Sequence, residues 1–220
     1  MASDISADIL IIGTGVAGAL PGAKLAQKGL KVAFLETGKR IDRAEAVETF
    51  WKAKIKVPES PYPNDETAPH PVSHRIDDYY QQMGPEKFKS TYTKLVGGTT
   101  WHWLGTTLRN LPADFKLQSL YGHAVDWPVD YDALEPFYLE AEQEIGVAGD
   151  SSQDLGSPRS GDFPMPVIPM SYLDKQFVKA LEGSKYQVSA TPQGRNSLFY
   201  ADRPECCGNA SCIPICPIQA

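Results

Sequence analysis

Cysteine is absent from residues 1–205 of this 220-residue sequence. All four cysteines lie between residues 206 and 216, so no distant thiol is present to close a disulfide across the fold. No apolar segment approaches the roughly 20 residues that a membrane-spanning helix needs. Residues 1–8 carry two acids and lack the pattern of a secretory or transit peptide. The sequence therefore argues against a disulfide-stapled scaffold and against a spanning helix.

Positive charge is also scarce. The sequence has 21 Lys and Arg residues against 27 Asp and Glu residues, a net charge of −6, and no basic run. This balance argues against nucleic acid or an anionic surface as a partner. The composition is ordinary for a globular protein, and the length suffices for one large domain or slightly more.

The most organised stretch joins a short apolar strand to a glycine-rich turn. The four aliphatic residues 9–12 predict a parallel strand that is covered on both faces. Gly13, Gly15 and Gly18 follow as G-x-G-x-x-G. In this motif the first glycine permits the tight turn, the second lets a pyrophosphate approach the backbone, and the third lets the helix pack closely on the strand. The N-terminus of the following helix favours phosphate.

A second apolar strand, residues 32–35, ends at Glu36. A carboxylate at this place accepts hydrogen bonds from the hydroxyls of an adenosine ribose. The β-α-β pattern therefore predicts a dinucleotide site, but it does not tell a flavin from a nicotinamide.

Three helices are predicted further along the chain. Apolar spacing indicates one over Arg43–Lys54 and one over Leu173–Leu181. A third lies between Asp130, a suitable N-cap, and Gly146, a suitable C-terminal stop. We expect the acids of this third helix to lie on a solvated face.

Irregular segments divide these elements. Five prolines within residues 57–75 predict a long excursion across the surface. Residues 148–170 are rich in Gly, Ser, Asp and Pro and predict a loop or linker, whereas Tyr186–Thr191 alternates like a strand. We expect part of an N-terminal domain over 1–147 and a second region over 171–220.

A glycine pair, Gly97–Gly98, precedes two threonines and the sequence Trp101-His102-Trp103. The pair lets the backbone approach a ligand closely. Taken alone, this segment is better explained as a buried aromatic turn with a hydrogen-bonded histidine.

The sequence ends in its most specific chemical signal, four thiols within eleven residues. Cys206, Cys207, Cys212 and Cys216 can converge on one centre, and the final C-x₃-C-P matches the end of a bacterial iron–sulfur run. Structural zinc, which usually uses C-x₂₋₄-C pairs spaced well apart, remains an alternative, as do reactive or disulfide-linked thiols.

Together, residues 13–18, 97–103 and 206–217 resemble the flavoprotein subunit of bacterial membrane-bound sugar and polyol dehydrogenases. These enzymes, of the glucose, fructose, sorbitol and gluconate 2-dehydrogenase type, belong to the glucose-methanol-choline oxidoreductases. The likeness covers most of the chain and includes residues 112–116 and 195–197. It implies an α/β fold of the Rossmann-like, three-layer type that binds FAD or NAD(P), incomplete at the C-terminus.

The resemblance implies FAD along the glycine loop, with the segment 97–103 beside the flavin. His102 matches a histidine that some relatives join covalently to the flavin. A 3Fe-4S cluster on Cys206, Cys212 and Cys216 is also implied, with Cys207 spare. The implied cofactor-binding residues are Gly13, Gly15, Val16, Ala17, Gly18, Glu36, Gly38, Arg40, Gly97, Gly98, Thr99, His102 and Trp103.

The implied activity is oxidation of a CH–OH group in a sugar or polyol, with hydride passing to flavin N5. Electrons then leave singly through the cluster to a cytochrome c. The implied partners are a small subunit that carries a twin-arginine signal and a membrane-bound multihaem cytochrome c. They would hold the protein at the periplasmic side of the inner membrane; without them we expect a cytoplasmic protein.

Two features depart from the family pattern. The family's catalytic histidine pair lies near the C-terminus of a longer chain, so we expect no catalytic residue here and no activity from this chain alone. Pro21–Gly22 predicts a disturbed phosphate-binding helix and weaker FAD binding. The alternative functions are a nicotinamide-dependent dehydrogenase with structural zinc and a non-catalytic redox or binding module.

Overall fold

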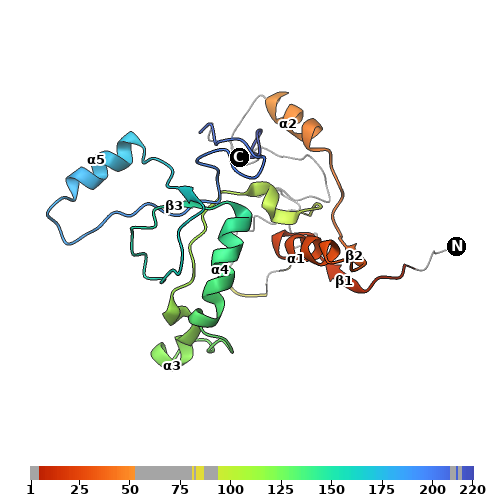
Figure 1. Ribbon diagram of the computed structural model, residues 1–220, viewed down its shortest axis with the longest axis horizontal. Helices are drawn as coiled ribbons and strands as arrows, with labels where there is room; N and C mark the ends of the chain where they lie inside the picture. The colour runs from red at the N-terminus through yellow and green to blue at the C-terminus, as the bar shows by residue number, and fades with distance from the viewer. Residues whose placement is uncertain (1–4, 53–80, 82, 87–93, 209–211, 213–214) are drawn as a thin grey trace. The chain divides into compact units, whose positions relative to one another are not determined.

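The computed structural model describes residues 5–52, 81, 83–86, 94–208, 212 and 215–220, and the rest is drawn in grey in Figure 1. The chain divides into two compact units. Unit 1 is Met1–Trp103 with Ala210–Pro217, and unit 2 is Leu104–Asn209 with Ile218–Ala220. The expected excursion over 57–75 lies outside the described residues. The expected domain division at 147 and 170 stays a prediction.

Unit 1 begins with the β-α-β arrangement that the sequence predicts. Strand β1 (Ile9–Ile12) leads into helix α1 (Val16–Gln27), and strand β2 (Val32–Leu35) returns parallel to β1 (Figure 1). Ile9 pairs with Val32, and Ile12 pairs with Leu35. The structure is a mixed helix and strand fold with small sheets, compatible with the α/β class. The three-layer arrangement stays a prediction.

The β1–β2 sheet is covered on one face. Ile11 packs toward α1, where an added Cβ on Gly18 would lie 3.2 Å from its side chain. Leu10 and Ile12 point the other way and are 62% and 79% exposed. The expectation that β1 is covered on both faces is therefore wrong in the described part of the chain, because the two-stranded sheet has its packed helix on one side.

Helix α2 (Arg43–Lys52) forms the second part of unit 1 and matches the predicted helix up to the last described residue, Lys52. Its N-terminus is capped by Asp42, whose Oδ1 accepts the N–H of Glu45 at 3.0 Å. The core of this part consists of Ala46, Phe50 and Ile215, with Ile41, Val47 and Trp101 packed against it.

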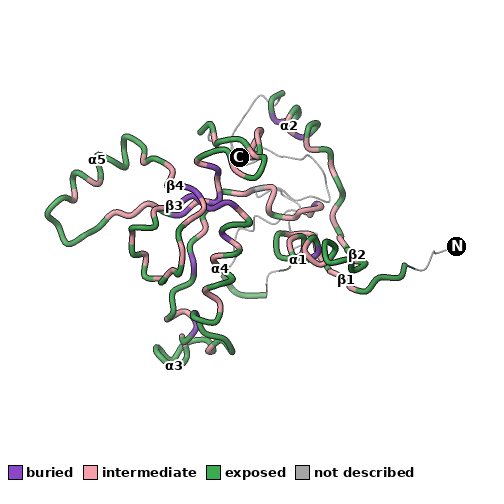
Figure 2. Tube along the Cα trace, in the orientation of Figure 1, coloured by how far each residue is buried: buried purple, intermediate pink, exposed green. Residues whose placement is uncertain are grey.

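Unit 2 contains a 3₁₀ turn and three helices in its described part. Several of its buried residues gather where α4 ends and β3 begins (Figure 2), and Phe115 and Tyr131 are buried at the start of α4. Helix α4 (Tyr131–Ile145) starts and stops as predicted. The Oδ1 of Asp130 accepts the N–H of Ala133 at 2.9 Å, and Gly146 adopts a left-handed φ of 80°. The other elements are η3 (Pro112–Lys116), α3 (Leu117–Tyr121), β3 (Ala148–Gly149), β4 (Met165–Pro166) and α5 (Tyr172–Ala180).

Two predictions for unit 2 need correction, whereas α5 forms as predicted. The expected loop 148–170 contains the short parallel strands β3 and β4. Tyr186–Thr191 is not a strand. The nearby bridges form instead at Gln193, with Thr106 and Ala148. No helix in the described part of the chain combines the length and apolar character needed to cross a membrane.

Candidate nucleotide-binding site

Each glycine of the G-x-G-x-x-G motif has the local geometry that its assigned role requires. Gly13 has a φ of +91°, which favours glycine, and its N–H donates to the carbonyl of Leu35 at 2.8 Å. A Cβ on Gly15 would meet nothing within 4 Å, so space is open above this backbone. A Cβ on Gly18 would lie 2.2 Å from the Gly13 carbonyl oxygen. Turn, open approach and close packing are thus all present.

The N-terminus of α1 is suited to an anion. Gly15 is its N-cap, no side chain caps it, and its first turn carries no acid. Unpaired N–H groups and the helix dipole favour negative charge at such an end. Val16 and Ala17, two of the predicted cofactor-binding residues, are both exposed there. Backbone and dipole therefore offer a place for phosphate.

The helix is continuous through Pro21, contrary to the disturbance expected from Pro21–Gly22. Gly22 is buried, and a Cβ there would lie 2.2 Å from the ring of Phe34. This glycine therefore lets α1 approach β2 closely. Its effect on FAD binding stays a prediction.

Glu36 lies immediately after β2, and its carboxylate is held by the glycine loop. Its Oε2 accepts the N–H of Thr14 at 2.9 Å and the hydroxyl of Thr14 at 2.6 Å. Its Oε1 accepts the N–H of Gly38 at 2.8 Å. The Thr14 hydroxyl, followed by the Gly38 N–H, lowers the pKa of Glu36 to about 2. At neutral pH this group is an anion fixed beside the phosphate loop.

The segment that contains Gly97 lies against the same place. Lys39 and Leu95 form a parallel bridge, and the N–H of Val96 donates to the Lys39 carbonyl at 3.0 Å. A Cβ on Gly38 would lie 2.4 Å from the Leu95 backbone, so glycine is required there. The N–H of Gly97 reaches the Thr14 hydroxyl oxygen at 2.9 Å. The contacts thus bring together the glycine loop, Glu36, Gly38 and Gly97.

The other residues predicted in this segment are placed less specifically. Gly97 and Gly98 have φ values of 94° and 57°, and Gly98 starts the 3₁₀ helix η2 (Gly98–His102). Thr99 and Arg40 are exposed, and Trp103 is half-buried. The side chain of His102 lies outside the described residues, so its predicted place near the flavin stays a prediction. The tryptophan before it, Trp101, donates from Nε1 to the Val96 carbonyl at 2.8 Å.

Sequence reasoning missed Thr14. It stands between the first two glycines of the motif, where the pattern allows any residue. A hydroxyl at this position was the available signal. Only the fold shows that it reaches both Glu36 and Gly97.

The cysteine segment is anchored at both ends. The N–H of Cys206 donates to the Asn196 carbonyl at 2.9 Å, and the buried Asn196 amide donates to the carbonyls of Arg203 and Pro204. In unit 1, Ile215 is 2% exposed in the α2 core, and Arg43 donates to the Cys216 carbonyl. These contacts fix the backbone beside two of the thiols.

All four cysteines are free of disulfides. Cys206 and Cys207 belong to unit 2, and Cys212 and Cys216 belong to unit 1. Among the residues that the structure describes, no three His, Cys, Asp or Glu side chains gather as a metal site. The ligand set Cys206, Cys212 and Cys216 therefore stays a prediction that rests on the sequence.

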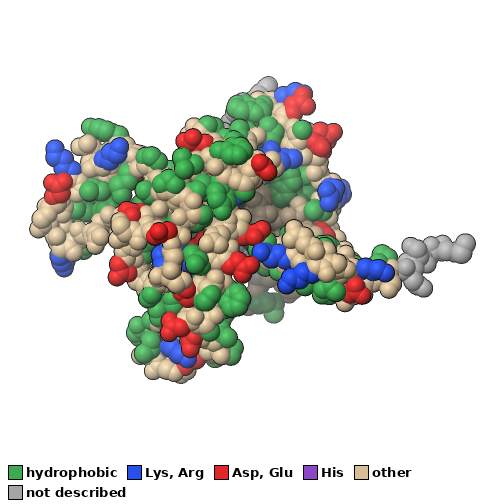
Figure 3. Space-filling model, viewed as in Figure 1, with side chains coloured by type: hydrophobic (Ala, Val, Ile, Leu, Met, Phe, Trp, Pro, Cys, Tyr) green, Lys and Arg blue, Asp and Glu red, His purple; other side chains and the backbone are tan. Residues whose placement is uncertain are grey.

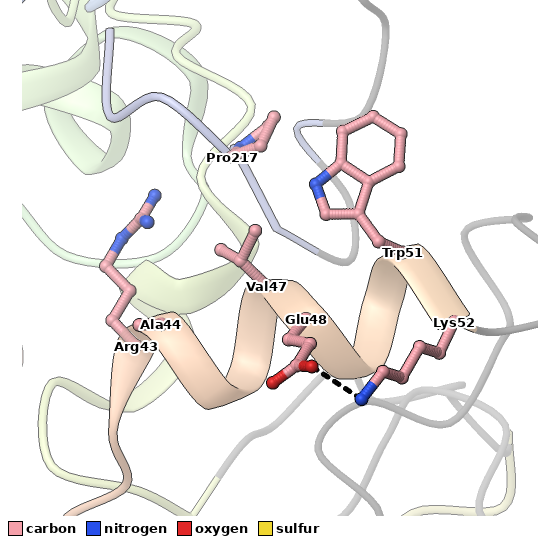
Figure 4. Close-up of a pocket in the computed structure, with 7 residues that line it drawn as sticks. All are labelled: Arg43, Ala44, Val47, Glu48, Trp51, Lys52 and Pro217. Carbon is pink, nitrogen blue, oxygen red and sulfur yellow. Dashed lines mark ion pairs between the residues drawn. The ribbon is translucent and has the colours of Figure 1, made fainter.

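An open groove of about 690 Å³ lies beside α2 in unit 1 (Figure 4). Val47 and Trp51 lie on the side of α2 toward Pro217, whereas Glu48 and Lys52 pair with each other. Trp51 is 55% exposed. The lining is largely apolar and lacks the converging backbone and carboxylate groups of the Thr14–Glu36 region. We assign it no ligand.

Unit 2 holds a buried network of charges that the sequence did not predict. Arg109 binds Glu142 through two bonds of 2.8 and 2.9 Å, and Nη1 donates to Glu135 at 2.9 Å. Arg159 binds the same Glu142 at 3.0 and 2.6 Å. The expectation of a solvated acidic face on α4 is wrong for Glu135 and Glu142. Two arginines balance two glutamates here, which indicates a structural role.

Known proteins are similar to this chain over most of its length. The large subunit of fructose dehydrogenase from Gluconobacter japonicus is 41% identical over 98% of the chain, which spans 41% of that subunit. The gluconate 2-dehydrogenase flavoprotein of Pantoea cypripedii is 26% identical over 89% of the chain and 36% of its own length. A cholesterol oxidase of Mycobacterium tuberculosis is 28% identical over 64% of the chain and 22% of its own length.

No protein-family model matches the chain. The chain spans about two fifths or less of the length of these relatives. They are dehydrogenases and an oxidase by name, and one is named a flavoprotein. The likeness to fructose dehydrogenase extends over nearly the whole chain. It therefore covers the glycine loop (residues 13–18), the Gly97 turn (residues 97–103) and the cysteine segment (residues 206–217). By sequence, the chain is similar over most of its length to members of the glucose-methanol-choline oxidoreductase family.

Proposed function

We propose that this chain forms the adenosine diphosphate-binding part of the FAD site in a dehydrogenase that oxidises CH–OH groups of sugars or polyols. The observation that carries the proposal is the open backbone above Gly15 beside the Glu36 anion. A diphosphate requires open backbone at a helix N-terminus, and ribose hydroxyls require an acceptor such as the carboxylate. The relatives named above supply the reaction class.

The residues fit this group in charge and space. The start of α1 carries no acid that would repel a diphosphate. Glu36 accepts hydrogen bonds from ribose hydroxyls, and its negative charge disfavours a nucleotide with a 2′-phosphate. Bound FAD would supply the acceptor for hydride from the alcohol carbon. The segment Gly97–Trp103, tied to the loop at Thr14, would lie toward the flavin end, with His102 nearest.

The cysteine segment supports a second, separate proposal. Cys206, Cys212 and Cys216 would hold a 3Fe-4S cluster, with Cys207 spare, and the cluster would pass electrons singly to a cytochrome c partner. The support is the close spacing of four thiols that form no disulfide, and the C-x₃-C-P ending. A small subunit with a twin-arginine signal and a membrane-bound multihaem cytochrome would hold the enzyme at the periplasmic side of the inner membrane. The word "subunit" in the name of the fructose-oxidising relative is consistent with such partners.

The test uses the whole protein that carries this chain. Purified protein is analysed for the flavin absorbance band, for iron, zinc and acid-labile sulfide, and for dye reduction with fructose, gluconate, glucose and sorbitol. The proposal predicts flavin, iron with sulfide, and reduction by at least one of these substrates. Zinc without iron, and reduction that needs a nicotinamide, would support the alternative dehydrogenase instead. If the protein carries no flavin and also shows no activity with a nicotinamide nucleotide, both the flavin-dependent and the nicotinamide-dependent dehydrogenase would be contradicted.

A further inference from the structure

The hydroxyl of Thr14 joins three segments of unit 1. It accepts the N–H of Gly97 at 2.9 Å and donates to Oε2 of Glu36 at 2.6 Å. The N–H of Thr14 donates to the same Oε2 at 2.9 Å. One residue of the glycine loop is therefore bonded both to the end of β2 and to the Gly97 turn.

The direction of these bonds is fixed. A backbone N–H can only donate, so the hydroxyl oxygen of Thr14 must accept from Gly97, and its single proton goes to Glu36. The acceptor at the end of this chain is an anion, which makes the last bond short and strong. Neighbouring bonds in such a chain also polarise one another.

This arrangement decides which oxygen of Glu36 is available to a ligand. A carboxylate oxygen accepts about two hydrogen bonds, and Oε2 already receives two from Thr14. Oε1 receives the Gly38 N–H at 2.8 Å, while the Thr37 hydroxyl stands at 3.5 Å, beyond a strong bond. A ribose hydroxyl therefore finds its acceptor at Oε1.

We propose that Thr14 is a positioning residue of the nucleotide site. Its hydroxyl orients the Glu36 carboxylate so that Oε1 accepts a hydrogen bond from a ribose hydroxyl. The same hydroxyl holds the Gly97 turn against the glycine loop. The inference rests on the proposed function, since it concerns the same FAD site. It adds that binding depends on a hydroxyl group that does not itself touch the ribose.

The first experiment measures FAD affinity of the flavin-depleted whole protein. Thr14→Val keeps the shape of the side chain but removes both bonds, one of them to a charged acceptor. The affinity for FAD is expected to fall about 10-fold to 100-fold. Thr14→Ser restores the hydroxyl and is expected to bind close to wild type. Thr49→Val is the matched control, because Thr49 is exposed on α2 and its hydroxyl donates to the carbonyl of Glu45, a residue of the same helix.

The second experiment separates positioning from general support of the fold. FAD affinity is measured for Glu36→Gln and for the double variant with Thr14→Val. If Thr14 acts through Glu36, the double variant loses much less than the product of the two single losses. The loss caused by Thr14→Val alone also grows as the pH falls from about 7 to about 5, since Glu36 without the hydroxyl titrates closer to its ordinary range.

The outcomes distinguish the two claims. Wild-type protein that binds no FAD would overturn the proposed function and this inference together. Wild-type protein that binds FAD while Thr14→Val binds it equally well would overturn the inference alone. Loss in Thr14→Ser as large as in Thr14→Val would also overturn it. If Thr14→Val unfolds, the Ser variant and its pH profile remain as the test.

Discussion

At the scale of single residues, Glu36 and Glu142 are two of the carboxylates with lowered pKa values, and the physical causes differ between them. At Glu36 the Thr14 hydroxyl is the largest cause, followed by the Gly38 N–H. At Glu142 burial acts to raise the pKa, but the hydrogen bonds from Arg109 and Arg159 outweigh it, so the pKa lies below its ordinary value. The first carboxylate belongs to the candidate nucleotide-binding site, and the second is buried in unit 2.

The Glu142 network predicts a large loss of stability when its central acid is removed. Glu142→Ala leaves two arginines that are 3% and 14% exposed without their main partner. The free energy of unfolding is expected to fall by about 3–5 kcal/mol. Glu48→Ala is the control, since Glu48 and its partner Lys52 are 62% and 74% exposed, and the loss of such a surface pair should leave the free energy of unfolding almost unchanged. Similar losses in urea unfolding of the two variants would contradict the account.

Glu36 predicts a pH-dependent contribution to stability. Its pKa in the folded chain lies at about 2, below its ordinary value of 4.5. The stabilisation is therefore complete above the ordinary pKa and is lost as the pH falls toward about 2. Since Glu36→Gln does not titrate, the difference in free energy of unfolding between wild type and this variant should shrink as the pH falls from about 6 to about 2. A difference that is the same across this range would argue against a paired carboxylate.

Residues of the site could be predicted where a motif fixes their spacing. Gly13, Gly15, Gly18 and Glu36 follow from a β-α-β pattern within one short stretch. Thr14 did not follow, because its partner Gly97 lies far along the chain. The prediction that the acids of α4 lie on a solvated face was wrong for the same reason. Arg109 and Arg159, which bury Glu142, come from separate loops, and local sequence does not show that contact.

At the scale of elements, helix α1 shows how closely a helix can approach a sheet when glycine faces it. Gly18 and Gly22 both lie on this face, but their surroundings differ. A Cβ on Gly18 would strike the backbone oxygen of Gly13, whereas a Cβ on Gly22 would strike the ring of Phe34, which is 43% exposed and can rotate. The Gly13 backbone cannot move without altering the turn.

This difference gives a prediction for two identical substitutions in one helix. Alanine gains helix propensity over glycine by about 1 kcal/mol at either position. Gly18→Ala is nevertheless expected to destabilise unit 1 by about 1–3 kcal/mol, because the contact with Gly13 must be relieved by a backbone shift. Gly22→Ala should stay within about 1 kcal/mol of wild type. Thermal unfolding measures both, and equal effects would contradict the packing argument.

Elements with local start and stop signals could be predicted from sequence, and elements that need a distant partner could not. Helix α4 has Asp130 and Gly146 at its ends, and both act as predicted. The segment Tyr186–Thr191 has a strand-like pattern, but it forms no strand with the residues that the structure describes, and the nearby bridges are at Gln193. Strands β3 and β4 formed within an expected loop, because Ala148 and Gly149 pair with Met165 and Pro166, a contact between its two ends that local sequence does not show.

At the scale of the whole molecule, the candidate site lies within unit 1, and acidic and basic side chains are interspersed on the face drawn in Figure 3. The site uses two backbone turns and one carboxylate, drawn from the glycine loop, the end of β2 and the Gly97 turn. The similarity to known oxidoreductases agrees with this geometry, since one of the relatives is named a flavoprotein. The reaction of the whole protein remains a proposal.

The central claim is that open backbone at Gly15, next to the Glu36 anion, receives the diphosphate of FAD. Gly15→Ala tests it most directly, because Gly15 has an ordinary φ of −61° and a Cβ there meets no atom within 4 Å. The variant should therefore unfold like wild type but bind FAD at least about tenfold more weakly, since the new methyl group occupies the space of the phosphates. Equal FAD affinity in Gly15→Ala and wild type, with both folded, would contradict the account.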